Sequence, residues 1–301
     1  SSVLRRRGRR RGLFALLCRL NGAAYTTRGR ARNHREFQSD CMLDFVLYLL
    51  GCLLFLVVTE KYRRATFGMV VLIAMLYPFV AEINQFSLFI QIKYYSVIIP
   101  TVLFSFTKCK PHFTGEMVEK VFAFMPSVLR FTLALNIAEA AVYVAVFDKF
   151  VTAFFGVVLI LTIPKFSYDE NQDIGFEDHW WVIAYSACLT IGLFFHPEES
   201  MLTSSGIAIL AIALLSCVYV KSWSKWITFR VYSLHYLIVL DAFFSRNGFS
   251  IYDSFNWSFF SPENRITPGL ENFFRIVSVV FCILLLYRCL KVRNGSSPMA
   301  S

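Results

Sequence analysis

Charged residues are scarce in this chain: Asp, Glu, Lys and Arg together make up 17% of its 301 residues. A typical soluble domain has about 25% charged and about 45–50% apolar residues, whereas 56% of this chain is hydrophobic. Disorder requires low hydrophobicity, which the chain does not have. The composition therefore argues against both a water-soluble globular domain and a disordered protein.

The sequence also lacks the common motifs of soluble enzymes. It has no glycine-rich phosphate loop, no Gly-x-Ser-x-Gly and no His-Glu-x-x-His, the patterns typical of nucleotide-binding proteins, serine hydrolases and zinc proteases. No histidines are paired at helical spacing, as haem or di-metal ligation would require; the five are His34, His112, His179, His196 and His235. We therefore expect no catalytic residues, no metal, and no cofactor other than bound phospholipid.

The eight cysteines include no Cys-x-x-Cys pair. Zinc and iron–sulfur clusters need grouped thiolates, so neither is expected. Six cysteines stand inside or beside apolar runs, where a free cysteine behaves as a small buried hydrophobe: Cys41, Cys52, Cys188, Cys217, Cys282 and Cys289.

Long apolar runs make up most of the chain. A bilayer-spanning helix needs about 20 mostly apolar residues. Nine runs approach this length, at residues 42–58, 65–81, 88–106, 121–147, 150–164, 181–195, 201–220, 226–244 and 273–290. They are apolar all round, and one chain of this size cannot bury nine such helices in its own core. We predict an all-α polytopic transmembrane helix bundle of about 8–9 spans. The five tryptophans stand near span ends and are interpreted as interfacial anchors: Trp180, Trp181, Trp223, Trp226 and Trp257.

A basic leader precedes the bundle. Residues 1–35 contain eleven arginines and no Lys, Asp or Glu, a composition typical of mitochondrial or plastid targeting. The alternative is a surface tail that binds anionic lipid; nucleic-acid binding is disfavoured because few aromatic residues interleave the arginines. We predict an Arg-rich N-terminal extension at 1–40, the transmembrane bundle at 41–292 and a flexible C-terminal tail at 293–301.

The basic residues of the loops conflict with this leader. Most of the loop Lys and Arg residues fall on the same side of the membrane as the C-terminus. The positive-inside rule then places the C-terminus on the inner side. The leader would lie outside, whereas import led by a presequence predicts the reverse. A miscounted span would resolve the conflict; we favour a bacterial-type bundle that later gained a basic extension.

Ionisable residues within spans are functional candidates, because inserting one costs roughly 2.5–3.5 kcal/mol. The intramembrane polar candidates are Lys93, Arg130, Asn136, Glu139, His235 and Asp241, with Asp44 as a further charged residue. Asn136 and Glu139 share a helix face, and Lys93 could pair with Glu139 across the bundle. Two hypotheses follow: a proton or solute path through Lys93, Glu139 and His235, or charge pairing that fixes helix packing.

The loop at residues 165–180 is acidic. Its five acids are Asp169, Glu170, Asp173, Glu177 and Asp178. They could attract a metal, and a membrane enzyme acting on lipid is a third functional hypothesis. The simpler interpretation is a solvated acidic loop.

Four short motifs occur in order along the chain. They are Lys93-Tyr94-Tyr95-Ser96-Val97, Asn136-Ile137-Ala138-Glu139-Ala140, Trp181-Val182-Ile183-Ala184-Tyr185 and Arg230-Val231-Tyr232-Ser233-Leu234. In this order, over about residues 85–245, the chain resembles a bacterial multi-pass membrane family known only as a domain of unknown function. After Ala-Tyr that family tends to continue with an acid and Trp-Asn, where this chain has Ser186-Ala187-Cys188-Leu189. The resemblance implies a compact helical bundle without an established reaction, and the departure implies that polar groups have been lost there.

Together these observations predict a non-catalytic accessory subunit of a large mitochondrial inner-membrane complex, in the respiratory chain or the ATP synthase. It would act in assembly and lipid binding, with other membrane subunits and anionic lipids such as cardiolipin as partners and no nucleic acid. The alternative is a transporter or channel with an intramembrane site made of Lys93, Glu139 and His235.

Overall fold

The computed structural model describes residues 34–80, 88–146, 149–170, 172–194, 200–246 and 267–295. Within these ranges the α-helices are α2 (His34–Lys61), α3 (Arg63–Val80), α4 (Leu88–Thr107), α5 (Glu116–Val146), α6 (Phe150–Leu161), α7 (His179–Phe194), α8 (Ser200–Val220), α9 (Trp226–Arg246) and α12 (Pro268–Gly295). Two 3-10 helices, η2 (Lys110–His112) and η3 (Trp223–Lys225), follow α4 and α8. Strands β1 (Ser167–Tyr168) and β2 (Ile174–Gly175) pair antiparallel after α6.

The all-α prediction is confirmed for the described residues, and each of the nine apolar runs coincides with one helix. Helix α2 begins at His34, before the predicted start of the bundle, and α12 continues to Gly295, past its predicted end. By length and composition, two of the described helices, α5 and α12, could cross a membrane, and four further apolar helices are shorter. Residues 1–33 of the basic leader and residues 296–301 of the tail lie outside the described part.

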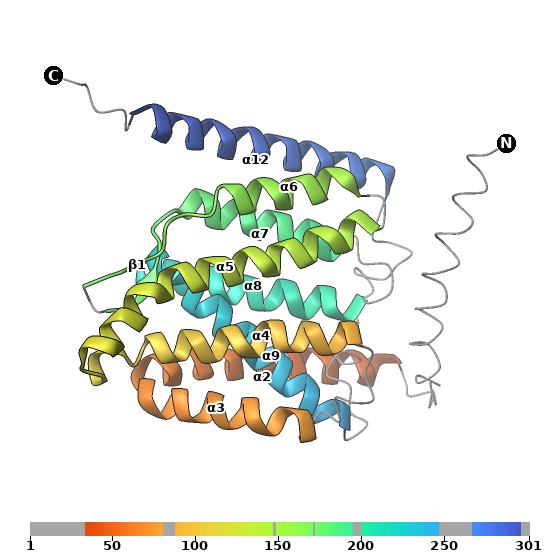
Figure 1. Cartoon of the computed structure of the whole chain (residues 1–301). Coiled ribbons are helices and arrows are strands. Elements are labelled where there is room, and N and C mark those ends of the chain that lie inside the picture. Colours follow the sequence, from red (N-terminus) through yellow and green to blue (C-terminus); the bar gives the residue numbers. More distant parts are fainter. Residues whose placement is uncertain are drawn as a thin grey trace.

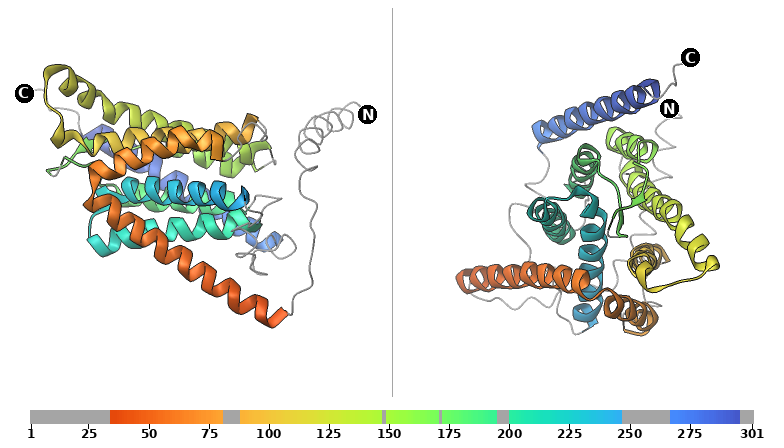
Figure 2. Two further views of the ribbon diagram at one scale, coloured as in Figure 1. Left: turned by 90° about the horizontal axis from the view of Figure 1, so that it is seen from below. Right: turned by 90° about the vertical axis from the view of Figure 1, so that its left-hand side faces the viewer.

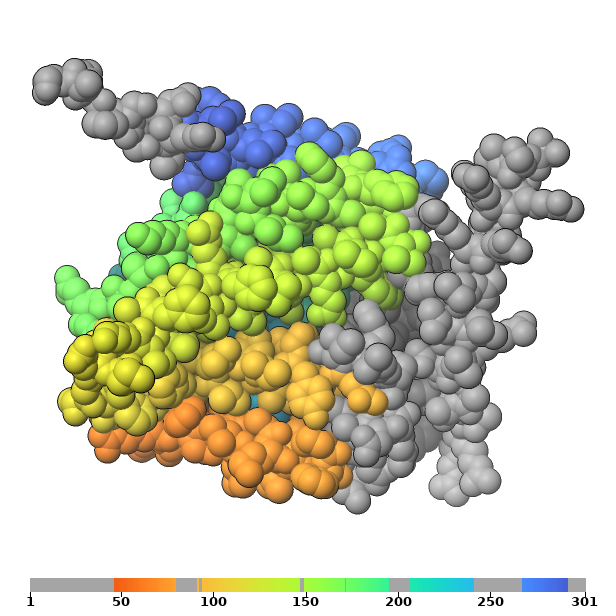
Figure 3. Space-filling model, viewed as in Figure 1, coloured from red at the N-terminus to blue at the C-terminus, as the bar shows by residue number. Residues whose placement is uncertain are grey.

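Helix α9 runs obliquely through the middle of the bundle (Figures 1 and 2) and packs against α2, α3, α4 and α8. Helix α5 lies along α6, and α12 covers α6 and α7 from outside. Figure 3 shows α3, α4, α5, α6 and α12 following one another across one face of the molecule. The central position of α9 brings its side chains to the polar sites described below.

Two of the tryptophans predicted as interfacial anchors lie in the core instead. Trp181 and Trp226 are both 0% exposed, and the ring of Tyr185 lies 5.4 Å from the first and 5.0 Å from the second. The anchor interpretation is wrong for these two, because a position at a span end does not reveal which way its side chain points. Trp180, by contrast, is 49% exposed, and Trp257 lies outside the described residues.

The outer faces of the helices carry large apolar side chains. Phe79 of α3, Phe124 of α5, Leu215 of α8 and Ile276 of α12 are between 63% and 76% exposed. Helix α8 has no charged residue from Ser200 to Val220, a length of about 31 Å at 1.5 Å per residue.

Helices α5 and α6 approach closely at a glycine. A Cβ added to Gly156 would stand 2.8 Å from the Cβ of Ala141, which is too close for two carbon atoms that are not bonded. Small residues allow this close approach of helix backbones. The contact fixes the spacing of α5, one wall of the cavity described next.

Candidate functional site

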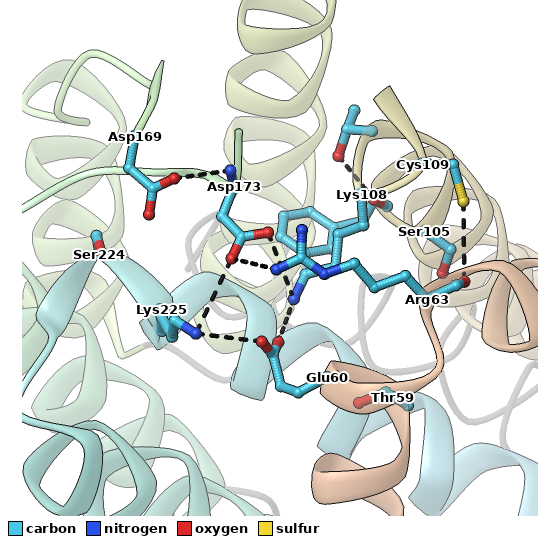
Figure 4. Close-up of polar contacts among 12 residues, drawn as sticks. Thr59, Glu60, Arg63, Ser105, Lys108, Cys109, Asp169, Asp173, Ser224 and Lys225 are labelled. Carbon is cyan, nitrogen blue, oxygen red and sulfur yellow. Dashed lines mark hydrogen bonds and ion pairs between the residues drawn. The ribbon is translucent and has the colours of Figure 1, made fainter. Parts of the chain in front are cut away.

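Five charged side chains from five segments meet at one end of the bundle (Figure 4). Glu60 lies in the last turn of α2, Arg63 begins α3, Lys108 follows α4, Asp173 precedes β2 and Lys225 ends η3. We call these five residues the ionic cluster. They come together because the turns between helices on this side of the bundle all lie at the same end.

Within the ionic cluster, two carboxylates share three cations. Lys108 Nζ donates to Glu60 Oε1, and Lys225 Nζ donates to Glu60 Oε2 at 3.2 Å. Arg63 Nη2 donates to Asp173 Oδ2 at 3.0 Å. Both lysine amines also lie 3.9 Å from an oxygen of Asp173. Each lysine therefore bridges the two acids, so the cluster is one network and not a set of separate pairs.

The ionic cluster is largely withdrawn from water: the side chain of Lys108 is 1% exposed and that of Asp173 is 5% exposed. Burial lowers the pKa of Lys108, while Glu60 and Asp173 oppose that change. Burial by itself would raise the pKa of Glu60, but Lys108 and Lys225 outweigh it and hold this pKa below its ordinary value. With all five groups ionised, three cations face two anions, which leaves one surplus positive charge.

The β1–β2 hairpin positions Asp173. Its backbone N–H donates to Asp169 Oδ1 at 2.8 Å, and the backbone N–H of Asp169 donates to the carbonyl of Asp173 at 2.8 Å. Further along the loop, Arg288 Nη1 of α12 donates to Asp178 Oδ1 at 2.8 Å. The expectation of a solvated acidic loop is thus wrong for Asp173, which is 4% exposed, whereas the side chain of Asp178 is 29% exposed. Among the described residues, no group of three or more His, Cys, Asp or Glu is placed to hold a metal ion.

A small cavity of about 60 Å³ lies between α4, α5, α7 and α9. The polar residues of its wall are Ser96, Thr101, Thr132, Asn136, Tyr185 and Arg230, and the rest of the wall is apolar. One wall residue, Phe104, packs edge to face on Tyr232 at 6.1 Å, and Lys108 Nζ lies 5.9 Å from the same Tyr232 ring. The cavity is therefore separated from the ionic cluster by little more than one aromatic ring.

Arg230 is the charged member of the cavity wall. The residue is 7% exposed. Its Nε and Nη1 atoms are buried and have no hydrogen-bond partner in the described part of the chain. A guanidinium carries five N–H donors and no acceptor, and leaving such donors unpaired away from water is unfavourable. Arg230 is thus the polar group in this region whose bonding is most incomplete.

All four sequence motifs contribute a polar residue to the cavity wall. Ser96 comes from the first motif, Asn136 from the second, Tyr185 from the third and Arg230 from the fourth. The motifs are spread over four helices and become neighbours only in the folded bundle. One polar residue of each motif therefore lies in the wall of the same cavity.

The predicted intramembrane residues fall into three groups. Asn136 lies in the cavity wall, and Glu139, almost one helical turn further along α5, accepts a hydrogen bond of 3.2 Å from Ser96 Oγ of α4. Lys93 and Asp241 lie on α4 and α9, but their side chains are outside the described part, as is that of Asp44. A pairing of Lys93 with Glu139 stays a prediction.

Arg130 and His235 lie apart from the cavity wall. Arg130 Nη2 donates to the carbonyl of Ile163 at 2.8 Å, which ties α5 to the segment after α6. His235 is 1% exposed, and neither of its ring nitrogens has a hydrogen-bond partner in the described residues. The described contacts therefore do not link His235 to Glu139, as a proton path through both residues would require.

Sequence reasoning missed the ionic cluster. The lysines were counted only among the loop charges that indicate orientation, Asp173 was one of the acids of the loop at residues 165–180, and Glu60 was not considered. Lys108 and Lys110 are only two residues apart, yet the first is buried in the cluster and the second lies over the Tyr168 ring at 4.2 Å. Nothing in the local sequence separates these two environments.

Comparisons with protein-family models, with curated proteins and with solved structures find no match to this chain. The resemblance to the bacterial family rests on its four motifs. Functional conclusions accordingly rest on the geometry of the ionic cluster and the cavity.

Proposed function

We propose that this chain is a multi-pass helical membrane protein that serves as a non-catalytic accessory subunit of a large mitochondrial inner-membrane complex, a respiratory-chain complex or the ATP synthase. The observation that carries the proposal is the outer face of α12. This helix covers the bundle from outside, and its outward side chains Phe273, Ile276, Ile283 and Tyr287 are 57–63% exposed. Contiguous apolar surface of this kind needs lipid or another protein to cover it.

The separation of charge along the bundle supports membrane insertion. Lys61, Lys165 and Lys221 stand at the helix ends near the ionic cluster. At the opposite end, Lys149 Nζ pairs with Glu271 Oε1 at 2.8 Å. The basic end fits a surface of anionic lipid such as cardiolipin, which attracts basic residues by about 1 kcal/mol each.

The Arg-rich composition of residues 1–35 supports a mitochondrial location. The polar contacts of the described residues support a structural role. Most of the charged side chains described inside the bundle bind one another or a backbone carbonyl. The ionic cluster and the Arg130–Ile163 contact hold helices together.

Blue-native electrophoresis of mitochondrial membranes tests this proposal. We expect the tagged chain to migrate with a complex far larger than 34.7 kDa, together with other membrane subunits. The double variant Ile276→Ala/Ile283→Ala should weaken that association. A matched change on another exposed face, Leu215→Ala/Val218→Ala on α8, serves as the control. Migration of the wild-type chain as a free monomer contradicts the proposal.

A second candidate function, transport of a small solute, is favoured by one observation: the cavity with the incompletely bonded Arg230 lies among four helices. Purified chain alone in liposomes would then support solute flux. Flux that is equal in wild type and in Arg230→Gln would contradict this candidate.

A further inference from the structure

We infer that the cavity between α4, α5, α7 and α9 is a binding site for one small monovalent inorganic anion, of the size of chloride or bicarbonate, held by Arg230. The inference goes beyond the accessory role and holds whether or not the chain is part of a larger complex.

The first reason is the bonding of Arg230. The residue is 7% exposed, and two of its guanidinium nitrogens have no hydrogen-bond partner in the described part of the chain. Burying a charged group without a counter-charge or hydrogen-bond partners strongly destabilises the folded state. An anion in the cavity would supply both the counter-charge and the missing hydrogen-bond acceptors.

The second reason is the chemistry of the other wall groups. The side chains of Asn136 and Tyr185 can both donate hydrogen bonds, and both residues belong to the cavity wall. The hydroxyls of Thr101 and Thr132 are already used, since they donate to the carbonyls of Val97 and Val128 at 2.7 and 2.8 Å. The donors left over, together with an otherwise apolar wall, suit a weakly hydrated anion.

The third reason is size and field. A volume of about 60 Å³ can hold a small ion. The ionic cluster beyond Phe104 and Tyr232 carries one more cation than anions, which favours an anion, although Asp169, whose Oδ1 accepts a hydrogen bond from the backbone N–H of Asp173, offsets this positive charge. No other charged side chain belongs to the wall.

One described charge opposes the anion. Glu139 accepts the hydrogen bond of Ser96 Oγ at 3.2 Å, and Ser96 is a wall residue, so a carboxylate stands close behind the wall. A competing explanation is that waters in the cavity link Arg230 to Glu139 and no anion binds. The variant Glu139→Gln distinguishes the two explanations. If the cavity binds an anion, loss of the negative charge of Glu139 strengthens that binding. If the cavity holds only water, the variant binds no anion.

Chloride binding to the detergent-purified full chain tests the inference. The protein is exchanged into gluconate, an anion too large for the cavity, and chloride is titrated at constant ionic strength while the chlorine NMR linewidth and the melting temperature are recorded. We expect saturable line broadening, reversed by bicarbonate, and a melting temperature that rises with chloride, since a ligand that binds only the folded state stabilises it.

Arg230→Gln should weaken chloride binding at least about tenfold, because a hydrogen bond to a charged group contributes about 1.5–3 kcal/mol. Arg130→Gln is the matched control, since Arg130 bonds to a carbonyl outside the cavity wall, and it should keep wild-type binding. If Arg230→Gln does not fold, Thr132→Met provides a second variant: it fills the cavity with apolar atoms and should abolish binding while the melting temperature in gluconate is kept.

The inference is overturned by any of three results: no saturable broadening with the wild-type chain, equal broadening with Thr132→Met, or a co-purified phospholipid that chloride cannot displace and that Arg230→Gln releases. The last result would assign Arg230 to a lipid phosphate. Stronger chloride binding by Glu139→Gln supports the inference, and weaker binding by that variant overturns it.

Discussion

Lys108 and Glu60 stand 48 residues apart in the sequence and form a direct hydrogen bond in the folded chain, with the lysine side chain 1% exposed. The pair joins the corner between α2 and α3 to the end of α4. Because Lys108 also lies near Asp173, the stability of this end of the bundle depends on a lysine that has no access to water.

Replacement of Lys108 by Met should destabilise the bundle by about 1–3 kcal/mol, because Glu60 Oε1 loses its donor in a largely buried site while Lys225 bonds only to Oε2. Thermal unfolding in detergent measures the change. Lys120→Met is the matched control: its partner Glu116 is also an acid, but both side chains are exposed, at 67% and 85%, and exposed pairs contribute about 0–1 kcal/mol. Equal losses in the two variants would contradict the structural role of Lys108.

Acid should weaken the bundle in part through Glu60. The folded-state pKa of Glu60 lies below its ordinary value of 4.5, so the unfolded chain binds a proton first as pH falls. The stabilisation from Glu60 is therefore complete above about pH 4.5 and is lost as pH drops through the lower folded-state value. We expect the stability difference between wild type and Glu60→Gln to shrink below pH 4.5, measured as melting temperature against pH. A stability difference that grows in acid would contradict a folded-state pKa of Glu60 below its ordinary value.

Two glycine-to-alanine changes should have opposite effects. At Gly156 the new Cβ would meet Ala141 at 2.8 Å, whereas at Gly68 it would meet nothing within 4 Å. Gly156→Ala should force α5 and α6 apart and lower the melting temperature, with a loss of about 1–3 kcal/mol from overpacking. Gly68→Ala should be neutral or stabilise α3 by up to about 1 kcal/mol, because alanine favours helix. Destabilisation by both would count against the close α5–α6 contact.

Labelling of introduced cysteines should place the two ends of the bundle on opposite sides of a membrane. Lys61→Cys and Lys221→Cys lie at the end of the ionic cluster, and Gly269→Cys lies at the start of α12, at the other end. In sealed vesicles a membrane-impermeant maleimide should label either the first two or the third. The experiment uses a background in which the native cysteines are replaced. Labelling of all three in intact vesicles would contradict the proposed insertion.

Apolar runs allowed the helices to be predicted, because a run that is apolar over fifteen or more residues forms a helix whether lipid or protein surrounds it. The polar sites could not be predicted in the same way. The ionic cluster is made by turns, and the sequence does not specify how far each turn brings its charges toward the others. Glu60 and Lys225 illustrate this: they are 165 residues apart and form a hydrogen bond of 3.2 Å.

The cavity was predictable only in part. Asn136 and Glu139 were identified from the cost of a polar group within a span, and they do lie beside α4. Arg230 escaped the same reasoning because it was counted among the basic residues at the span ends, although it stands one turn inside the predicted span. Its side chain instead turns inward, and that orientation depends on how α9 crosses the bundle.

The ionic cluster has a consequence for the order in which the chain is assembled. Glu60, Arg63 and Lys108 are translated before Asp173 and Lys225, which follow 65 or more residues later. Until Asp173 arrives, the nascent bundle holds two of these cations against a single acid at the corner of α2 and α3. Asp173 of the β1–β2 hairpin then supplies the second acid, and Lys225 restores the surplus positive charge of the complete cluster, so this corner of the bundle acquires its full set of contacts only when the second half of the chain is made.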